Sequence, residues 1–308
     1  MRTAIVFPGQ GSQKVGMGRA WAEAFPEARS TFDEASEALG FDVAKLCWEG
    51  PESELQLTAN TQPAILVASV AIARVLRAKG VSAVAVAGHS LGEYSAHVAA
   101  GTFSLANAAR LVRRRGELMQ AAVPVGVGAM AAILGLDADV VAEVARTAST
   151  GDEVCSVANY NSPEQTVIAG HKPAVERAMA AAKERGAKRA LLLPVSAPFH
   201  CALMLPARSG LKPYLDQTPF EDPALPVVVN IDAAAVLDGA AARDALVRQI
   251  DGPVRWVEVV RGLRAGFSAE RFVEVGPGSV LTGLVKRIAP DVEAFAVAEP
   301  EALTKLGL

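Results

Sequence analysis

Apolar and polar residues follow one another along this chain in two different rhythms. Short apolar runs such as Ala4–Phe7 are typical of buried strands, whereas longer stretches such as Pro63–Lys79 repeat their apolar residues at helical spacing. The two kinds of stretch alternate through most of the 308 residues. This order is typical of an α/β protein with a mainly parallel sheet. The pattern therefore predicts that class, with further strands at Pro226–Asn230 and Arg271–Val275.

The middle of the chain has a rhythm of its own. Its apolar runs predict elements in the order β-α-β-β-α-β, which is the order of a ferredoxin-like unit. We therefore expect a small domain inserted at residues 125–196, while residues 1–124 and 197–308 form the larger domain. The elements expected in the insert are a strand at 128–136, a helix at 137–147, strands at 153–159 and 165–169, a helix at 172–185 and a strand at 189–195.

Composition narrows the classes of function. Hydrophobic residues make up 51% of the chain, charged residues 20%, and the formal net charge is −3. These values are typical of a globular protein and argue against non-specific nucleic-acid binding. The cysteines Cys47, Cys155 and Cys201 are far apart and predict neither a disulfide framework nor a metal site.

The sequence carries no obvious membrane or export signal. No apolar run approaches the ~20 residues that span a bilayer, and the N-terminus lacks the long apolar core of a secretory signal. We therefore expect a cytoplasmic protein that works without a membrane.

The segment Ala83–Ala96 carries the clearest chemical signal. An apolar run there ends in Gly-His-Ser-Leu-Gly at residues 88–92 and continues in helix-compatible sequence. This pentapeptide at a strand-to-helix junction is the pattern of a nucleophile elbow, in which the glycines permit a tight turn. The free N–H groups at the start of the helix favour negative charge beside Ser90. The pattern indicates Ser90 as a nucleophile, although the same pentapeptide also arises by chance in glycine-rich chains.

A serine nucleophile needs a base, and the chain has only four histidines: His89, His97, His171 and His200. His200 follows a strand at the point where the chain leaves the expected insert. Rigid elements on either side hold such a loop in place, as they do for catalytic loops generally. Spacing alone cannot pair His200 with Ser90, because such residues meet only in space. A purely structural role for His200 therefore stays open.

A buried arginine is the second candidate. A helix is predicted from Ser104, a suitable N-cap, to about Ala121. Helical spacing places Arg115 on its apolar face and Arg113 and Arg114 toward its polar face. A guanidinium in apolar surroundings needs an anion, which is either a carboxylate of the protein or a carboxylate of the substrate. The sequence leaves both interpretations open.

Eight segments along nearly the whole chain resemble the malonyl-CoA:acyl-carrier-protein transacylases of fatty-acid synthesis and the acyltransferase domains of polyketide synthases. The resemblance implies an α/β-hydrolase-like large domain with a parallel sheet and an inserted ferredoxin-like small domain. The segments occur in family order and read FPGQGSQ at 7–13, TQPA at 61–64, GHSLGEYSA at 88–96, RRGELMQ at 114–120, VANYNSPEQTVIAG at 157–170, PVSAPFHCALM at 194–204, RQIDGPVRW at 248–256 and EVGPGSVL at 274–281.

The resemblance assigns catalytic roles at matching positions. It implies Ser90 as nucleophile and His200 as base. The backbone N–H groups of Gln10 and Leu91 would form the oxyanion hole. The main-chain carbonyl of Gln249 would orient His200, so that the usual acidic third residue is absent.

The resemblance also implies a substrate and a reaction. Arg115 would bind the malonyl carboxylate during ping-pong transfer from malonyl-CoA, through a malonyl-serine ester, to the thiol of acyl carrier protein. Coenzyme A and phosphopantetheine would arrive with the substrates, and no cofactor or metal would be bound. The residues matching positions near the family's pocket are Gln62, Met119, Asn159, Asn161 and Phe199, the last resembling a bulky residue of malonyl-selective members.

Acyl carrier protein is expected to be acidic, so its docking requires a local basic surface. Lys183, Arg185, Lys188 and Arg189 form a dense basic cluster in the expected insert. An ordinary solvated face explains the same residues equally well. We expect the cluster to serve docking on a monomeric enzyme.

Two other classes of protein fit part of the sequence. A serine esterase or thioesterase shares Ser90 and His200, but normally has an acidic residue between them along the chain. It also gives no reason for Arg115 on an apolar face. A non-catalytic scaffold within a larger synthase would not need the serine, histidine, arginine and oxyanion loop together. The transacylase is therefore the preferred interpretation.

Overall fold

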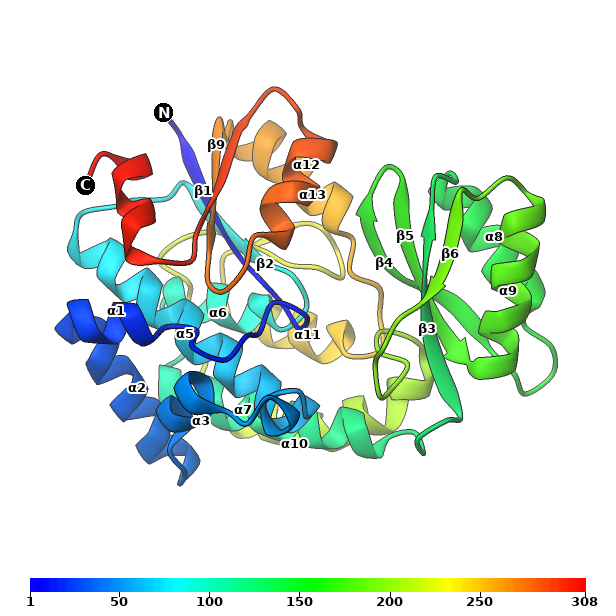
Figure 1. The fold of residues 1–308 in the computed structure, drawn as a ribbon, viewed down its shortest axis with the longest axis horizontal. Helices are drawn as coiled ribbons and strands as arrows, with labels where there is room; N and C mark the ends of the chain where they lie inside the picture. The colour runs from blue at the N-terminus through cyan, green and yellow to red at the C-terminus, as the bar shows by residue number, and fades with distance from the viewer.

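The computed structural model describes residues 1–308 and contains two β-sheets. The larger has six strands in the order β10-β9-β1-β2-β7-β8, and the smaller has four in the order β4-β5-β3-β6. The sheets lie beside each other, the smaller one in green (Figure 1). The mixed α/β class is as predicted. The strands of the larger sheet are β1 (Thr3–Phe7), β2 (Ala85–Gly88), β7 (Val227–Val228), β8 (Ala235–Val236), β9 (Arg271–Val275) and β10 (Glu293–Val297).

The larger sheet is parallel except for its edge strand β8. Every side chain of β1 is buried, as expected for a parallel strand covered on both faces. Because successive side chains of a strand point to opposite faces, Ile5 and Phe7 pack into one hydrophobic layer and Ala4 and Val6 into the other. Parallel pairing also brings the ends of β1 and β2 together, with Phe7 in register with Gly88.

Helices form the layers on either side of this sheet. One layer includes α5 (Thr58–Ala78), α6 (Gly92–Ala99) and α7 (Leu105–Ala121), and the other is formed by α12 (Trp256–Phe267) and α13 (Val280–Ile288) (Figure 1). The remaining helices are α1 (Arg19–Ala24), α2 (Pro26–Leu39), α3 (Val43–Glu49), α4 (Glu52–Leu55), α10 (Leu205–Gln217) and α11 (Gly239–Gln249), with 3-10 turns at Ala202–Met204 and Pro300–Leu306.

The helix α5 is longer than the sequence pattern suggested. It begins at Thr58, and Pro63 lies inside it instead of at its start. By length and composition alone α5 could cross a membrane, contrary to the expectation that no such run exists. However, 78% of its most apolar window is buried inside the protein. The helix therefore serves as part of the core.

The smaller sheet is antiparallel and its elements follow the predicted order. A separate hydrophobic cluster lies between this sheet and its two helices. We propose on that basis that residues 125–196 form an inserted domain and that residues 1–124 and 197–308 form the other. The elements are β3 (Gly128–Leu134), α8 (Ala138–Ala148), β4 (Cys155–Ser162), β5 (Gln165–His171), α9 (Lys172–Glu184) and β6 (Arg189–Leu192).

Two strands are shorter than predicted. The strand expected at 189–195 ends at Leu192, because Pro194 has no N–H with which to continue the pairing. The strand expected at 226–230 is reduced to Val227–Val228, since Asn230 gives its N–H to a side chain instead. Both departures occur where the chain approaches the candidate site.

Candidate active site

The elbow at Ser90 adopts the tight turn that its glycines predict. Ser90 has a φ of 51°, a left-handed conformation that is uncommon for a residue other than glycine. A Cβ added to Gly88 would lie 1.9 Å from the carbonyl of Gly92, and one added to Gly92 would lie 2.1 Å from the carbonyl oxygen of Phe7. Only glycine fits at either position, so the serine is held at the edge of the sheet.

His200 meets Ser90 across the site. Its Nε2 lies 2.7 Å from the Oγ of Ser90, and its Nδ1 lies 3.0 Å and 3.1 Å from the carbonyl oxygens of Gln249 and Gly252. Two carbonyl acceptors require a proton on Nδ1, which leaves Nε2 free to accept the serine proton. Burial, helped by the charge of Arg115, lowers the pKa of His200 to about 3. The imidazole is therefore neutral at ordinary pH.

Arg115 reaches the same point from α7. Its Nη2 donates to the Oγ of Ser90 at 3.1 Å and to the Oε1 of Gln249 at 3.0 Å, and its Nη1 donates to the Oε1 of Gln62 at 2.9 Å. The side chain is 2% exposed and lies 5.6 Å from the centre of the Tyr94 ring. It forms no ion pair with a carboxylate of the protein. Of the two interpretations that the sequence left open, the structure therefore excludes a carboxylate of the protein as its ion-pair partner.

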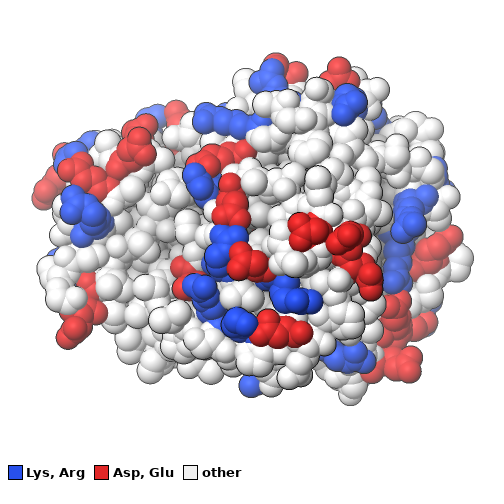
Figure 2. Space-filling view, turned by 180° about the vertical axis from the view of Figure 1, so that it is seen from behind, with Lys and Arg blue, Asp and Glu red and all other residues white.

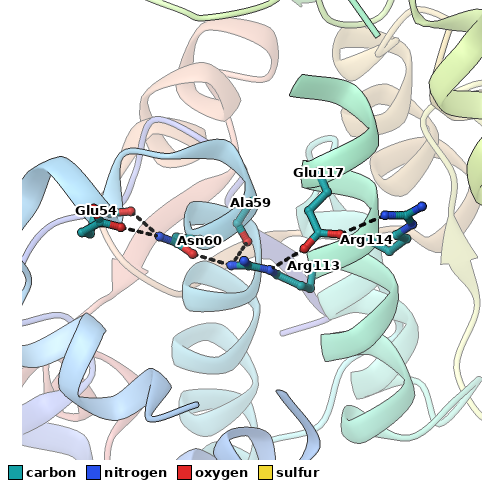
Figure 3. Close-up of polar contacts among 6 residues, drawn as sticks. All are labelled: Glu54, Ala59, Asn60, Arg113, Arg114 and Glu117. Carbon is teal, nitrogen blue, oxygen red and sulfur yellow. Dashed lines mark hydrogen bonds and ion pairs between the residues drawn. The ribbon is translucent and has the colours of Figure 1, made fainter. Parts of the chain in front are cut away.

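The two preceding arginines have the different surroundings that helical spacing predicts. Figure 3 shows Arg113 reaching from α7 toward the start of α5 and Arg114 pointing the other way, both paired with Glu117. Arg113 also donates to the side chain of Asn60 and, at 3.2 Å, to the carbonyl oxygen of Ala59. That carbonyl lacks the usual helical partner, because the residue four positions later is Pro63, which has no N–H. These contacts fix α7 against the start of α5, with Arg115 facing inward.

Gln249 touches three parts of the site through three different groups. Its main-chain carbonyl accepts from His200, and its Oε1 accepts from Arg115. Its Nε2 donates to the carbonyl oxygen of Ser90 at 3.0 Å. The side-chain contacts could not be read from the sequence, because they join residues from three distant segments of the chain.

The loop after β1 lies directly against the elbow. A Cβ added to Gly9 would come within 2.4 Å of the carbonyl oxygen of His89, so glycine is needed for this approach. The backbone N–H groups of Gln10 and Leu91 donate to no group of the protein, and both residues line the cavity beside Ser90. Their arrangement fits an oxyanion hole.

The cavity in front of Ser90 has a volume of about 290 Å³ and lies between the two sheets. Gln165 and Met130 of the smaller sheet line it together with Ser90 and His200. All five residues expected near the pocket line it as well, namely Gln62, Met119, Asn159, Asn161 and Phe199. Asn161 also lies 2.8 Å from the Nε2 of His89, which links the smaller sheet to the elbow.

The sequence pattern did not indicate two residues that lie at the elbow. Asn230 and Glu93 are both fully buried and hydrogen-bonded around Ser90. Glu93 lies within a motif that resembles the family, but the motif carries no sign of what its carboxylate contacts. The structure shows no group of three or more His, Cys, Asp or Glu side chains that could hold a metal ion.

Known proteins resemble this chain over nearly its whole length. Residues 4–300 match a family described as an acyl transferase domain. The malonyl CoA-acyl carrier protein transacylase of Escherichia coli strain K12 is 54% identical over 97% of each chain, and that of Bacillus subtilis is 44% identical over 98% of this chain and 95% of its own.

Solved structures are similar as well. An acyl carrier protein S-malonyltransferase from Vibrio cholerae has a TM-score of 0.97 at 50% identity and covers 99% of this chain and 100% of its own. A malonyl-transacylase in complex with a type II PKS acyl-carrier protein has a TM-score of 0.96 at 49% identity, and the match covers 99% of this chain and 98% of the transacylase chain.

Proposed function

The chain belongs to the acyl transferase family, and we propose that it transfers malonyl groups from malonyl-CoA to the phosphopantetheine thiol of acyl carrier protein. The observation that carries the choice of malonyl is Arg115. It is a buried cation 3.1 Å from the Oγ of Ser90, and it has only neutral oxygen acceptors. A carboxylate next to the acyl carbon would supply the missing charge in the two-pronged geometry that arginine favours.

In the first half-reaction, the Oγ of Ser90 attacks the thioester carbonyl while the Nε2 of His200 accepts its proton. The carbonyl oxygen becomes an oxyanion held by the N–H groups of Gln10 and Leu91. The intermediate then collapses, the C–S bond breaks, and coenzyme A leaves with the proton from His200. The product on the enzyme is a malonyl ester of Ser90.

In the second half-reaction, the phosphopantetheine thiol gives its proton to His200 and attacks the ester carbonyl. The same two N–H groups hold the new oxyanion. Collapse breaks the C–O bond, and the proton passes from His200 to the Oγ of Ser90. His200 needs no acidic partner, because a thiolate is a good leaving group and the carbonyls of Gln249 and Gly252 already fix the ring.

Phe199 lines the cavity next to the base, and we propose that it restricts the size of the acyl group. Excluding a single methyl group is worth only ~1–3 kcal/mol. Methylmalonyl-CoA would therefore remain a poor substrate and would not be rejected completely.

The basic cluster of the smaller sheet is our proposed docking surface for acyl carrier protein. Arg185 is paired with Glu143 at 3.0 Å, whereas Lys183, Lys188 and Arg189 form no ion pair. These three exposed cations without an ion pair favour an acidic partner.

The strand register of the smaller sheet supports this location, because it places Arg189 of the cluster close to the cavity. Leu134 pairs with Gln165, which lines the cavity, and on its other side with Arg189. Adjacent strands lie ~4.8 Å apart, so the backbone of Arg189 is about 10 Å from that of Gln165. Next to it, Leu191 and Leu192 are 48% and 49% exposed, which offers apolar contact beside the charges.

We further propose that the protein acts as a cytoplasmic monomer without a bound cofactor. All groups named in the two half-reactions come from one chain, so no second copy is needed to complete the site. The acyl group is carried throughout by coenzyme A, Ser90 or phosphopantetheine.

The proposed substrate is tested by replacing Arg115 with alanine and measuring single-turnover acylation of the enzyme by malonyl-CoA and by acetyl-CoA. Loss of a charge-assisted contact of ~3 kcal/mol predicts that malonyl transfer falls by about 100-fold or more. Acetyl transfer should survive or improve, because acetate has no carboxylate to bind. If both rates fall equally, Arg115 is structural and the malonyl proposal loses its support.

A further inference from the structure

The buried side chain of Asn230 binds both sides of the elbow. Its Oδ1 accepts from the N–H of Ser90 at 2.7 Å, and its Nδ2 donates to the carbonyl oxygen of Gly88 at 2.7 Å. The opposite amide orientation would place donor against donor and acceptor against acceptor, so these two bonds also fix which end of the amide is which.

The location of Asn230 explains the need for these bonds. Parallel pairing of β2 with β7 ends at Ala87 and Val228, immediately before the chain turns into the elbow. The backbone of the elbow thus leaves the sheet with polar groups that still need partners. The amide of Asn230 supplies both partners and continues the pairing beyond the last strand residue.

Glu93 closes the arrangement. Its Oε2 accepts from the backbone N–H of Asn230 at 2.7 Å, and its own N–H donates to the carbonyl oxygen of Ser90 at 3.1 Å. Ser90, Asn230 and Glu93 therefore form a closed ring of hydrogen bonds. Asn230 and Glu93 are 0% exposed and do not line the cavity, so neither contacts the substrate.

The ring holds a peptide whose orientation matters for the chemistry. The carbonyl of Ser90 and the N–H of Leu91 belong to the same planar peptide unit. Because Ser90 has a φ of 51°, this conformation persists only where its surroundings enforce it. A rotation at the elbow would misplace the nucleophilic oxygen and one oxyanion donor at once.

We propose that Asn230 and Glu93 are positioning residues that hold the Ser90 elbow in the conformation required for acylation. This assignment rests on the proposed function, in which Ser90 is the nucleophile. Asn230 acts through its amide on the backbone of residues 88 and 90, and Glu93 acts through the backbone N–H of Asn230. Both roles depend on hydrogen-bond geometry and not on the charge of the carboxylate.

The test is single-turnover acylation of folded variants, with binding and chemistry measured separately. Misplacing reactive groups by ~1 Å costs about 100-fold in rate, so Asn230→Ala should slow acylation by roughly 30-fold or more, with the affinity for malonyl-CoA changed by less than about threefold. Glu93→Ala should slow acylation by at least about tenfold through the same geometry. Glu93→Gln keeps an acceptor for the N–H of Asn230, so acylation should stay within about threefold of the unaltered enzyme.

Controls keep the proposal open to contradiction. Ser69→Ala removes a buried hydroxyl outside the site and should leave acylation unchanged. If Asn230→Ala does not fold, Asn230→Asp takes its place, because it keeps the shape but sets an oxygen against the carbonyl of Gly88. Normal acylation by a folded Asn230 variant would overturn the assignment. A Glu93→Gln defect as large as that of Glu93→Ala would overturn the part that concerns Glu93.

A second acyl donor separates this proposal from the proposed function. The burst of p-nitrophenolate from p-nitrophenyl acetate reports acylation of Ser90 without any malonyl group. An unaltered enzyme that gives this burst but is not acylated by malonyl-CoA would contradict the proposed function. Loss of the burst in Asn230→Ala, but not in Glu93→Gln, would still support the positioning assignment.

Discussion

At the scale of single residues, Arg115 has a guanidinium surrounded by neutral acceptors and an aromatic ring. Helical spacing was enough to predict that it is buried, because its neighbours three and four positions away are apolar. Spacing could not predict its partners, since Gln62, Ser90 and Gln249 come from distant segments. The structure supplies that information, and it is what points to a substrate carboxylate.

Glu93 predicts how stability depends on pH. Burial raises its pKa from an ordinary 4.5 to about 7, although hydrogen bonds with Gln249 and the backbone of Asn230, and then the charge of Arg115, act in the opposite direction. Between these pH values the unfolded chain has released the Glu93 proton while the folded protein still holds it, so the free energy of unfolding falls as the pH rises. Above about pH 7 both states have released the proton, and the fall ends. Glu93→Gln removes this loss. The unfolding free energy of the variant minus that of the unaltered enzyme should therefore be larger at pH 8 than at pH 4.5, by up to roughly 3 kcal/mol.

Urea unfolding at several pH values measures this difference. The matched control is Glu37→Gln, which changes an exposed glutamate that forms no ion pair. The pH dependence of the unfolding free energy should change more in Glu93→Gln than in this control. Equal changes in the two variants would contradict the raised pKa of Glu93.

At the scale of elements, the site depends on the parallel pairing of β1 with β2. This pairing puts the loop of Gln10 next to the elbow of Ser90, with Phe7 in register with Gly88. The order of strands and helices could be predicted because its signal lies in local periodicity. Their ends were less predictable, since Pro194 and Asn230 stop strands through contacts and geometry that periodicity does not record.

Close packing of α6 against β1 predicts a contrast between two glycines. Gly92→Ala would place a Cβ 2.1 Å from the carbonyl oxygen of Phe7, so the start of α6 must shift and the protein should lose ~2–4 kcal/mol of stability. Gly283→Ala changes an exposed glycine of α13 with no atom within 4 Å of the new Cβ. That variant should gain ~0.5–1 kcal/mol, because alanine favours the helix.

Thermal and urea unfolding of both variants tests this contrast. Gly92→Ala should also lose acylation, because the shift reaches Ser90 two residues earlier. Two variants of equal stability would mean that α6 has room to move away from β1.

At the scale of the whole molecule, the cavity lies between the two sheets. Figure 2 shows acidic and basic side chains interspersed among larger uncharged areas on one face, without an extended basic area. The net charge of −3 already argued against nucleic acid as the main partner. The docking of acyl carrier protein that we propose therefore relies on a local basic edge near the cavity.

Charge reversal tests that edge. Lys188→Glu combined with Arg189→Glu should raise the KM for acyl carrier protein by about tenfold and leave the KM for malonyl-CoA unchanged, because only the carrier docks there. The control is Lys45→Glu combined with Arg77→Glu, two exposed and unpaired residues elsewhere on the surface. Equal effects of the two pairs, or equal effects on both substrates, would remove the docking proposal.

We propose that Ser90 carries the malonyl group between two thiols, and intact-protein mass measures this directly. The enzyme is mixed with malonyl-CoA and then with acyl carrier protein bearing phosphopantetheine, beside a Ser90→Ala variant. We expect one malonyl adduct that requires Ser90 and moves to the carrier. An adduct lost to water at the same rate with or without carrier would contradict it and indicate a thioesterase.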